Sequence, residues 1–314
     1  MAVGIDEPAA LDTTRAFTRA DAISAGISPK MLRGSRFRRL FRGVYISASV
    51  PRSPLHRVSG ALLLHPPGAV ATHLSAARVY RVPVPDLPDE HVSVFDPRDR
   101  RPHDGIRCHV AAPGTRVLRV RGVDVQDPFS MFVALASVLS LVDLVVVGDA
   151  LVRMYDIAPG RLVAECEASS DRHVAAARRA AAYVREGVDS VMETRLRMLI
   201  VLAGLPEPQV NHQLREESGA VVRRLDLSYP LIRLIIEYDG RQHAESTRQW
   251  NSDLVRREEF DDGDWKILVV TAKGIYTEPA ETVGRIHRAL VTRGYPAVPA
   301  RLAEGWRAHF PGRG

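Results

Sequence analysis

Residues 220–240 read AVVRRLDLSYPLIRLIIEYDG, and this stretch decides the fold that the sequence predicts. The apolar segments on either side of Pro230 alternate as β-strands do, because successive side chains of a strand point to opposite faces. Pro230 marks the turn between them. A hairpin that turns there would bring Asp226 on the first strand close to Glu237 on the second.

Helices and strands are expected to alternate around this hairpin. Ser190 caps a predicted helix whose apolar residues recur at helical spacing. Residues 210–215 and 265–272 are predicted strands, residues 244–263 a polar helix and residues 278–294 a closing helix. The order from Ser190 is α-β-β-β-α-β-α, which predicts a domain of the mixed α/β (α+β) class.

Acidic side chains interrupt the apolar strands of the hairpin at Asp226, Glu237 and Asp239. Acids gathered in a dry site repel one another, and a divalent cation is the simplest compensation. Two carboxylates from neighbouring strands supply hard oxygen ligands for Mg²⁺ or Mn²⁺ and leave positions for water and phosphate. The alternative is that Asp226 and Glu237 pair with Arg224 and Arg233 on an exposed face of the sheet.

This pattern resembles a known class of nucleases. The strings R-x-D-x-S-Y-P at residues 224–230 and I-E-Y-D-G-x-x-H at residues 236–243 resemble the PD-(D/E)xK restriction-endonuclease-like superfamily. More narrowly, they resemble a bacterial branch related to the very-short-patch repair endonucleases. The resemblance covers about residues 186–294 and implies a metal-dependent DNA endonuclease or nickase.

The resemblance assigns roles to individual residues. Asp226 and Glu237 would be the metal ligands. Glu193, the acid of the preceding helix, would complete the metal shell or bind a second ion. The candidate catalytic residues are these three together with Asp239 and His243.

The sequence departs from the superfamily pattern at Asp239, where a Lys is usual. That Lys normally positions or activates the water. Here His243 could take this role, and Arg241 or Lys266 could supply positive charge. Asp239 could instead recruit a second cation, and the sequence leaves these alternatives open.

Residues 1–52 have the pattern of a winged helix-turn-helix. Thr18 can cap a first helix, and Ser28 with Pro29 can start a second. A strand pair turning at Arg42-Gly43 follows and would form the wing. The strings F-T-R-A-D-A-x-x-A-G-I-S and F-R-R-L-F-R-G-V-Y resemble the winged-helix part of AbiEi-type antitoxin regulators, and the two halves together resemble a common actinobacterial two-part architecture.

The excess positive charge of the chain lies in this region. Residues 1–60 contain 10 Arg or Lys and 4 Asp or Glu, and the whole chain has 43 and 37, so the remainder holds 33 of each sign. A basic end on a neutral body suggests a polyanionic partner, duplex DNA first, although a solvated basic surface explains it equally well. The basic side chains expected on the second helix and the wing, within reach of phosphates or groove edges, are Lys30, Arg33, Arg36, Arg38, Arg39 and Arg42.

The middle region, residues 53–185, carries no recognisable chemistry. We expect helices over residues 55–65, 73–80, 128–157 and 162–185, and strands near residues 91–95 and 106–110. His73, Ser75 and His91 are expected to be structural, because no acid or base partner is evident beside them. The nuclease-like domain is expected over residues 186–296, and residues 297–314 as a tail with a short helix and a frayed end.

The remaining features exclude some classes of protein. Cys108 and Cys166 are 58 residues apart, which predicts no disulfide framework or zinc knuckle and fits a reducing cytoplasm. The N-terminus lacks the pattern of a secretory signal, and the apolar run 131–148 contains Asp143, so a buried helix is expected there and no membrane partner.

Three functions remain: a nuclease, a non-catalytic DNA-binding regulator with a degenerate nuclease fold, and an antitoxin-like module that binds a protein partner in a toxin–antitoxin or defence system. A homodimer is compatible with each of them.

Overall fold

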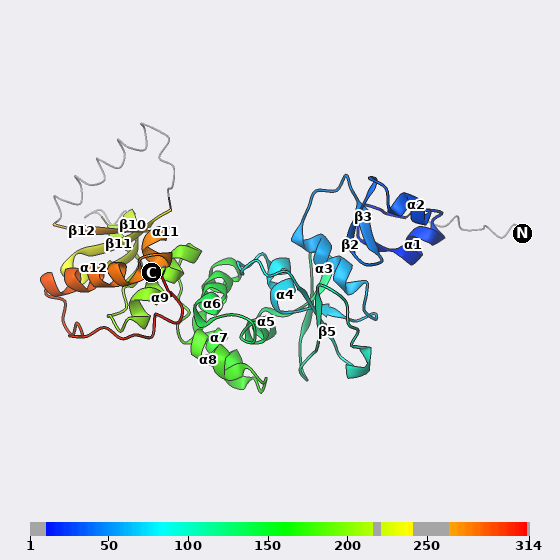
Figure 1. Ribbon diagram of the computed structural model, residues 1–314. Helices are drawn as coiled ribbons and strands as arrows, with labels where there is room; N and C mark the ends of the chain where they lie inside the picture. Colours follow the sequence, from blue (N-terminus) through cyan, green and yellow to red (C-terminus); the bar gives the residue numbers. More distant parts are fainter. Residues whose placement is uncertain (1–10, 216–220, 241–263, 313–314) are drawn as a thin grey trace, which may run out of the picture. The chain divides into compact units, whose positions relative to one another are not determined.

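Figure 1 shows the computed structural model of the chain, which describes residues 11–215, 221–240 and 264–312. The chain is a mixed α/β protein made of two compact units. The first unit comprises Met1–Val138 and Ser170–His173, and the second comprises Leu139–Ser169 and Val174–Gly314. The expected boundaries at residues 52 and 185 therefore fall inside these units. None of the described helices is long and apolar enough to cross a membrane.

The first unit begins with two short helices and a small sheet. The elements are β1 (Phe17–Thr18), α1 (Arg19–Ser24), α2 (Pro29–Leu32), β2 (Phe37–Phe41) and β3 (Val44–Ser47), and the strand order is β1-β3-β2. Each helix and strand of this region lies where the sequence predicts it, apart from the two-residue β1, which was not predicted.

Local side-chain chemistry explains where these elements start. The Thr18 hydroxyl accepts a hydrogen bond from the Asp21 amide at 3.1 Å, and the Asp21 carboxylate accepts one from the Thr18 amide at 2.8 Å, which is a capping box. Ser28 caps α2. The turn between β2 and β3 contains Gly43 with a φ of 84°, a value that favours glycine.

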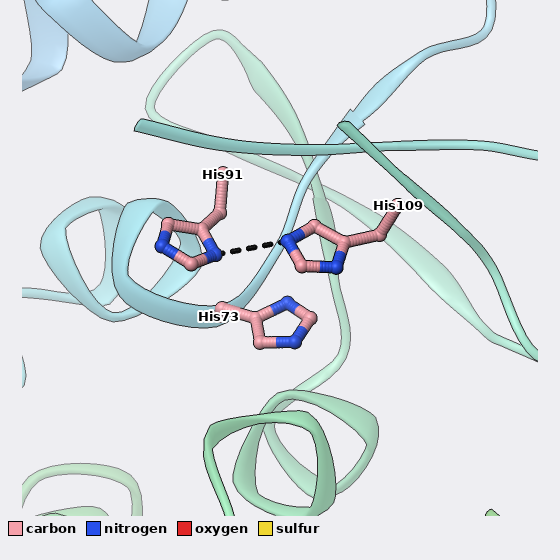
Figure 2. A group of neighbouring side chains, drawn as sticks. All are labelled: His73, His91 and His109. Carbon is pink, nitrogen blue, oxygen red and sulfur yellow. Dashed lines mark hydrogen bonds between the residues drawn. The ribbon is translucent and has the colours of Figure 1, made fainter. Parts of the chain in front are cut away.

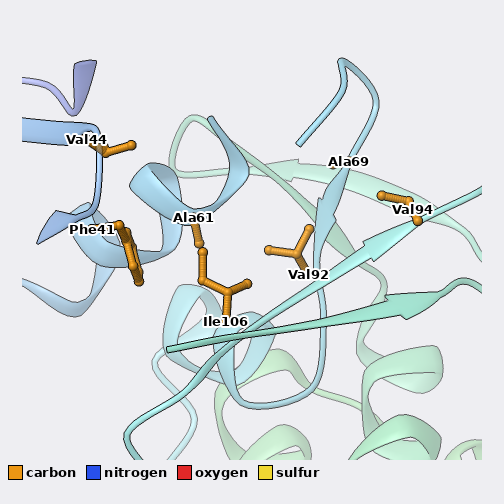
Figure 3. Packing of buried hydrophobic residues seen from close by; sticks show 7 residues of the cluster. All are labelled: Phe41, Val44, Ala61, Ala69, Val92, Val94 and Ile106. Carbon is orange, nitrogen blue, oxygen red and sulfur yellow. The ribbon is translucent and has the colours of Figure 1, made fainter. Parts of the chain in front are cut away.

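The hairpin of β2 and β3 shares a hydrophobic core with the segment that follows it. Phe41 and Val44 pack with Ala61 of the next helix and with Val92 and Ile106 of the larger sheet (Figure 3). A separate small cluster holds α1 and α2 on the sheet. The β2–β3 hairpin is consequently tied to the middle region by common buried side chains.

A five-stranded sheet with three α-helices completes the first unit. Its elements are α3 (Pro54–Leu62), β4 (Val70–Ala71), α4 (His73–Tyr80), β5 (Glu90–Val94), the 3-10 helix η1 (Pro97–Asp99), β6 (Ile106–Val110), β7 (Val117–Val120), β8 (Val123–Gln126) and α5 (Pro128–Leu135). The strand order is β6-β5-β4-β8-β7. The pairs β5–β6 and β4–β8 are parallel and the others antiparallel. The sequence predicted α3, α4, β5 and β6 but not β4, β7 or β8, and it predicted α5 only as the start of a longer helix.

The second unit starts with three helices, α6 (Leu141–Tyr155), α7 (Pro159–Ala168) and α8 (Val174–Ala181). The expectation of continuous helices over residues 128–157 and 162–185 was wrong. Ser140 caps a new helix by accepting a hydrogen bond from the Asp143 amide at 3.2 Å, so α5 and α6 are separate. The second predicted helix is interrupted between Ala168 and Val174.

A four-stranded sheet forms the rest of the second unit. The elements are α9 (Val191–Leu202), β9 (Gln209–Arg215), β10 (Val221–Tyr229), the 3-10 helix η2 (Pro230–Ile232), β11 (Leu234–Asp239), β12 (Lys266–Thr271), α11 (Ala272–Tyr276) and α12 (Pro279–Thr292). The strand order is β12-β11-β10-β9, and only β11–β12 is parallel among these pairs. The predicted polar helix over residues 244–263 lies outside the described residues. The helix α11 was not predicted.

The C-terminal tail packs onto this unit. Trp306 and Phe310 are buried, and the Ala303 amide donates a hydrogen bond to the Ala203 carbonyl at 2.9 Å. Between residues 297 and 312 the chain forms turns and no helix. The expected short helix was therefore wrong.

Candidate functional site

Two of the candidate acids lie on neighbouring strands of the second unit. β10 and β11 pair in the register Leu227↔Ile236 and Ser228↔Ile235. One further step in this register sets Asp226 opposite Glu237, and opposite residues of an antiparallel pair have Cβ atoms about 4.5–5.5 Å apart. Both acids are partly exposed. The predicted hairpin therefore sets the two acids on neighbouring strands, one position beyond the last pair of the register.

Glu193 lies in the first turn of α9, the helix that packs against β10 and β11. Its carboxylate accepts a hydrogen bond from the Asp189 amide at 3.0 Å, and its side chain is largely buried. Burial raises the pKa of the Glu193 carboxyl, and the charge of Asp226 raises this pKa further. Glu193 and Asp226 thus interact electrostatically, as two ligands of one cation would.

The three acids do not form a closed cage. We searched residues 11–215, 221–240 and 264–312 for three or more His, Cys, Asp or Glu side chains whose ligand atoms all lie within 4.8 Å of one another. Three histidines meet this criterion, whereas Glu193, Asp226 and Glu237 do not. Mg²⁺ is commonly held by one or two carboxylates together with waters and substrate phosphates, so this donor set fits it.

The other residues expected near the acids are differently placed. Asp239 ends β11 and is partly exposed. Lys266 pairs with Leu234, three positions along β11 from Glu237, or about 10 Å away. Lys266 therefore lies away from the acids. Arg241 and His243 lie outside the described residues.

The alternative for the acids placed Arg233 on the strand that carries Glu237, but Arg233 lies outside β11. Its φ of 50° places it in the left-handed region between η2 and β11, before the strand begins. The alternation of strand side chains does not extend to it.

A buried ionic network, which the sequence did not reveal, holds α9 on α6. The Arg197 guanidinium is fully buried and bonds the Asp149 carboxylate at 2.9 Å and the Glu207 carboxylate at 3.0 Å. The Thr194 hydroxyl also donates to Asp149, at 2.8 Å. Arg197 lies one turn after Glu193, so this network fixes the helix that presents Glu193 to the sheet.

The basic side chains predicted for the N-terminal helix and hairpin are mostly solvent-exposed. The exposed ones are Lys30, Arg33, Arg36, Arg39 and Arg42. Arg38 is different, because it is partly buried and its guanidinium donates a hydrogen bond to the Val50 carbonyl at 3.1 Å. Arg38 thus ties the hairpin to the segment after it, and it also lines a cavity beside the hairpin.

A cavity of about 550 Å³ lies beside this hairpin, and five of its twelve lining residues are arginines. Glu90 is buried there and pairs with Arg57 at 3.2 Å and Arg78 at 2.8 Å, so part of the positive charge is neutralised. Arg39 and Arg52 also line the cavity. The exposed basic surface therefore continues into a concave, arginine-lined region.

Three histidines meet in the first unit (Figure 2). His73 begins α4, His91 lies on β5 and His109 on β6. Nδ1 of His91 and Nε2 of His109 are 3.0 Å apart, and the ring centroid of His73 is 4.0 Å from that of His109 and 5.0 Å from that of His91. One ligand nitrogen of each ring lies within 4.8 Å of the other two.

The environment of this histidine trio (His73, His91 and His109) keeps its rings neutral. Burial and, second to it, the neighbouring His109 lower the pKa of His73 to about 2 and that of His91 to about 3. Burial also lowers the pKa of His109. Neutral imidazoles keep a lone pair for a proton or a metal.

The backbone and its neighbours hold His73 in place. Its φ of 47° lies in the left-handed region, which costs about 1–3 kcal/mol for a residue other than glycine. The Thr72 hydroxyl lies 2.9 Å from Nδ1 of His73 and also bonds the side chain of Gln126. The ring is therefore oriented by a hydrogen-bonded neighbour.

The sequence singled out His73 and His91 as separate structural residues and did not single out His109. The link between them is the parallel register of β5 and β6, in which Ser93 pairs with His109. Because His91 and Ser93 share a strand face, His91 and His109 do as well. Alternation within each strand gives the face, but nothing local in the sequence gives the register.

Comparison with known proteins adds relatives but no activity. Over 201 residues the chain is 26% identical to each of two uncharacterized proteins of Mycobacterium tuberculosis, MT2308 of strain CDC 1551 / Oshkosh and Rv2248 of strain ATCC 25618 / H37Rv. The similarity covers 63% of this chain and 73% of each relative. No family model matches the chain. Neither relative has a name that states an activity, so similarity alone assigns no function.

Proposed function

We propose that the second unit is a divalent-metal-dependent nuclease domain that hydrolyses DNA phosphodiester bonds. What supports the proposal is the antiparallel register of β10 and β11, which ends at Leu227↔Ile236, one position short of Asp226 and Glu237, together with the electrostatic interaction between Asp226 and Glu193. Carboxylate oxygens at these positions suit Mg²⁺ or Mn²⁺.

Each acid has a distinct part in this proposal. Asp226 and Glu237 would hold the ion, and Glu193 would complete its shell from the helix side. The bound ion would supply a water of lowered pKa and offset the charge of the scissile phosphate. Arg197, through Asp149 and Glu207, keeps α9 in the position that Glu193 requires.

The test is cleavage or nicking of double- and single-stranded DNA with added Mn²⁺. Wild type should cleave at least one of these substrates, and Asp226→Asn and Glu237→Gln should abolish the cleavage. Glu281→Gln serves as the matched control, because Glu281 is an exposed acid on α12 outside the site. Wild type that leaves every substrate intact, or cleavage that survives both site variants, would remove the support for catalysis.

A second candidate function is DNA binding without catalysis, through the N-terminal helix and hairpin. The exposed side chains of Lys30, Arg33, Arg36, Arg39 and Arg42, next to an arginine-lined cavity, favour it. Lys and Arg that neutralise phosphates release counterions, so each contact adds about 0.9 to the slope of log affinity against log salt concentration.

This second function is tested by measuring the affinity for duplex DNA over a range of salt concentrations. Arg39→Gln should lower the affinity and reduce the salt slope by about one. Arg15→Gln is the matched control, since Arg15 is exposed, belongs to the same unit and lies outside the predicted surface. Equal effects of the two substitutions would mean that binding is not localised on the hairpin.

A further inference from the structure

We propose that His73, His91 and His109 form a binding site for a transition-metal ion of the Zn²⁺ type, with three imidazole ligands and a fourth position open to water. The site lies in the first unit and does not depend on the nuclease proposed for the second. Its ligands, and therefore its metal, differ from those of the carboxylate site.

The distances between the rings suit such an ion. Tetrahedral Zn²⁺ with Zn–N bonds of about 2.0–2.1 Å holds its ligand nitrogens about 3.3 Å apart. The nitrogens of His91 and His109 are 3.0 Å apart. A ligand nitrogen of His73 lies within 4.8 Å of both, so a shift of at most about 1.5 Å would complete the coordination.

The chemistry of the trio selects the class of metal. Imidazole suits Zn²⁺, Cu²⁺, Ni²⁺ and iron, whereas Mg²⁺ and Ca²⁺ require oxygen ligands. Within the part of the chain that the structure describes, the group of ligand atoms contains three imidazoles and no carboxylate. Metal ligands must also be deprotonated, and burial already keeps these rings neutral.

The protein holds the three rings on separate, well-anchored elements. His73 is oriented by Thr72, as a metal-bound histidine usually is by an outer hydrogen bond. The backbone amide of His91 donates to the Ser75 hydroxyl at 2.8 Å, which ties β5 to α4. His109 is partly exposed, which leaves the ion a route from solvent.

A bound ion would join the edge of the five-stranded sheet directly to α4. β6 is an edge strand of the five-stranded sheet and pairs with β5. Coordination by His109 would fasten this edge to the start of α4. This role would explain why His73 has a left-handed backbone conformation, since that conformation places its ring at the site.

The experiment uses the full-length chain, stripped with a chelator and titrated with Zn²⁺ by calorimetry. We expect one Zn²⁺ to bind at this site, and His91→Gln and His109→Gln to weaken that binding by more than about 100-fold, since loss of an outer partner alone costs about 10–100-fold. His65→Gln is the matched control, because His65 and His73 are equally exposed, at 7%. Asp226→Asn distinguishes this site from the carboxylates and should leave the binding unchanged.

A second measurement covers the case in which the histidine variants do not fold. Wild type loaded with one equivalent of Cu²⁺ should give electron paramagnetic resonance spectra with couplings to imidazole nitrogens. Absence of Zn²⁺ binding by wild type, loss of binding in His65→Gln equal to that in His91→Gln, or Cu²⁺ spectra without imidazole coupling would each overturn the proposal.

Discussion

Replacement of Arg197 by methionine is expected to destabilise the second unit by about 3–5 kcal/mol, because it breaks a buried ionic network by removing one partner. The Arg197 side chain is fully buried and the Asp149 side chain is 2% exposed. Arg197 makes two charge-assisted hydrogen bonds, to Asp149 and Glu207, each of which contributes about 1.5–3 kcal/mol. Methionine fills most of the vacated volume, so loss of the charge dominates over loss of packing.

The penalty should depend on pH. Burial already raises the pKa of the Asp149 carboxyl, and Arg197 opposes this rise. Without Arg197 the folded-state pKa moves further above its unfolded value of about 3.9. The folded variant then takes up a proton that the unfolded chain does not, so its stability increases as the pH falls from 7 through that pKa.

Urea unfolding monitored by tryptophan fluorescence measures this effect directly. The three tryptophans, Trp250, Trp265 and Trp306, all belong to the second unit, so the signal reports on it alone. The double variant Asp149→Asn/Arg197→Met should recover part of the loss, since no buried carboxylate is left without its cation. A loss below about 1 kcal/mol for Arg197→Met at pH 7 would refute the view that this network is desolvated.

Three further predictions concern two buried histidines, the cap of α1 and one glycine. The stability of the first unit should rise with pH between about pH 3 and 6.5, because only the unfolded chain protonates His73 and His91 there. Urea unfolding followed by circular dichroism would show this rise, and a flat profile would contradict it. Thr18→Ala should cost about 1 kcal/mol in the same assay through loss of the cap on α1, whereas no change would mean that the cap is replaced by solvent. Gly274→Ala would place a Cβ 2.7 Å from the buried Thr282 hydroxyl. We expect this substitution to lower the free energy of unfolding, measured by tryptophan fluorescence, by about 1–3 kcal/mol, and Thr282→Ala to restore part of the loss.

Elements with strong local signals were predictable from the sequence. The helix over His73–Tyr80 and the strand over Ile106–Val110 lie at the predicted residues. The hairpin around Pro230 was also predicted, since its two apolar runs adjoin a turn signal. In each case the deciding interactions lie within one element or between sequence neighbours.

Elements without such signals were missed or merged. β4 has two residues, too few for an alternation to be visible. The helices α5 and α6 were merged because the apolar run continues through Ser140, although this residue and Asp143 carry the cap signal. The strand β11 was started too early, because the left-handed conformation of Arg233 is set by the turn and not by its side chain.

The two candidate metal sites differ in whether a local sequence signal pairs their ligands, and this difference explains why only one of them was found in the sequence. Asp226 and Glu237 are joined by a short hairpin, so a turn and a period of two are sufficient to pair them. His91 and His109 lie on parallel strands, which need a long connection whose length does not fix the register. His73 joins them from a helix that packs on the sheet. A buried histidine that looks structural in the sequence can thus belong to a candidate site, because its chemistry depends on which distant histidines the fold places beside it.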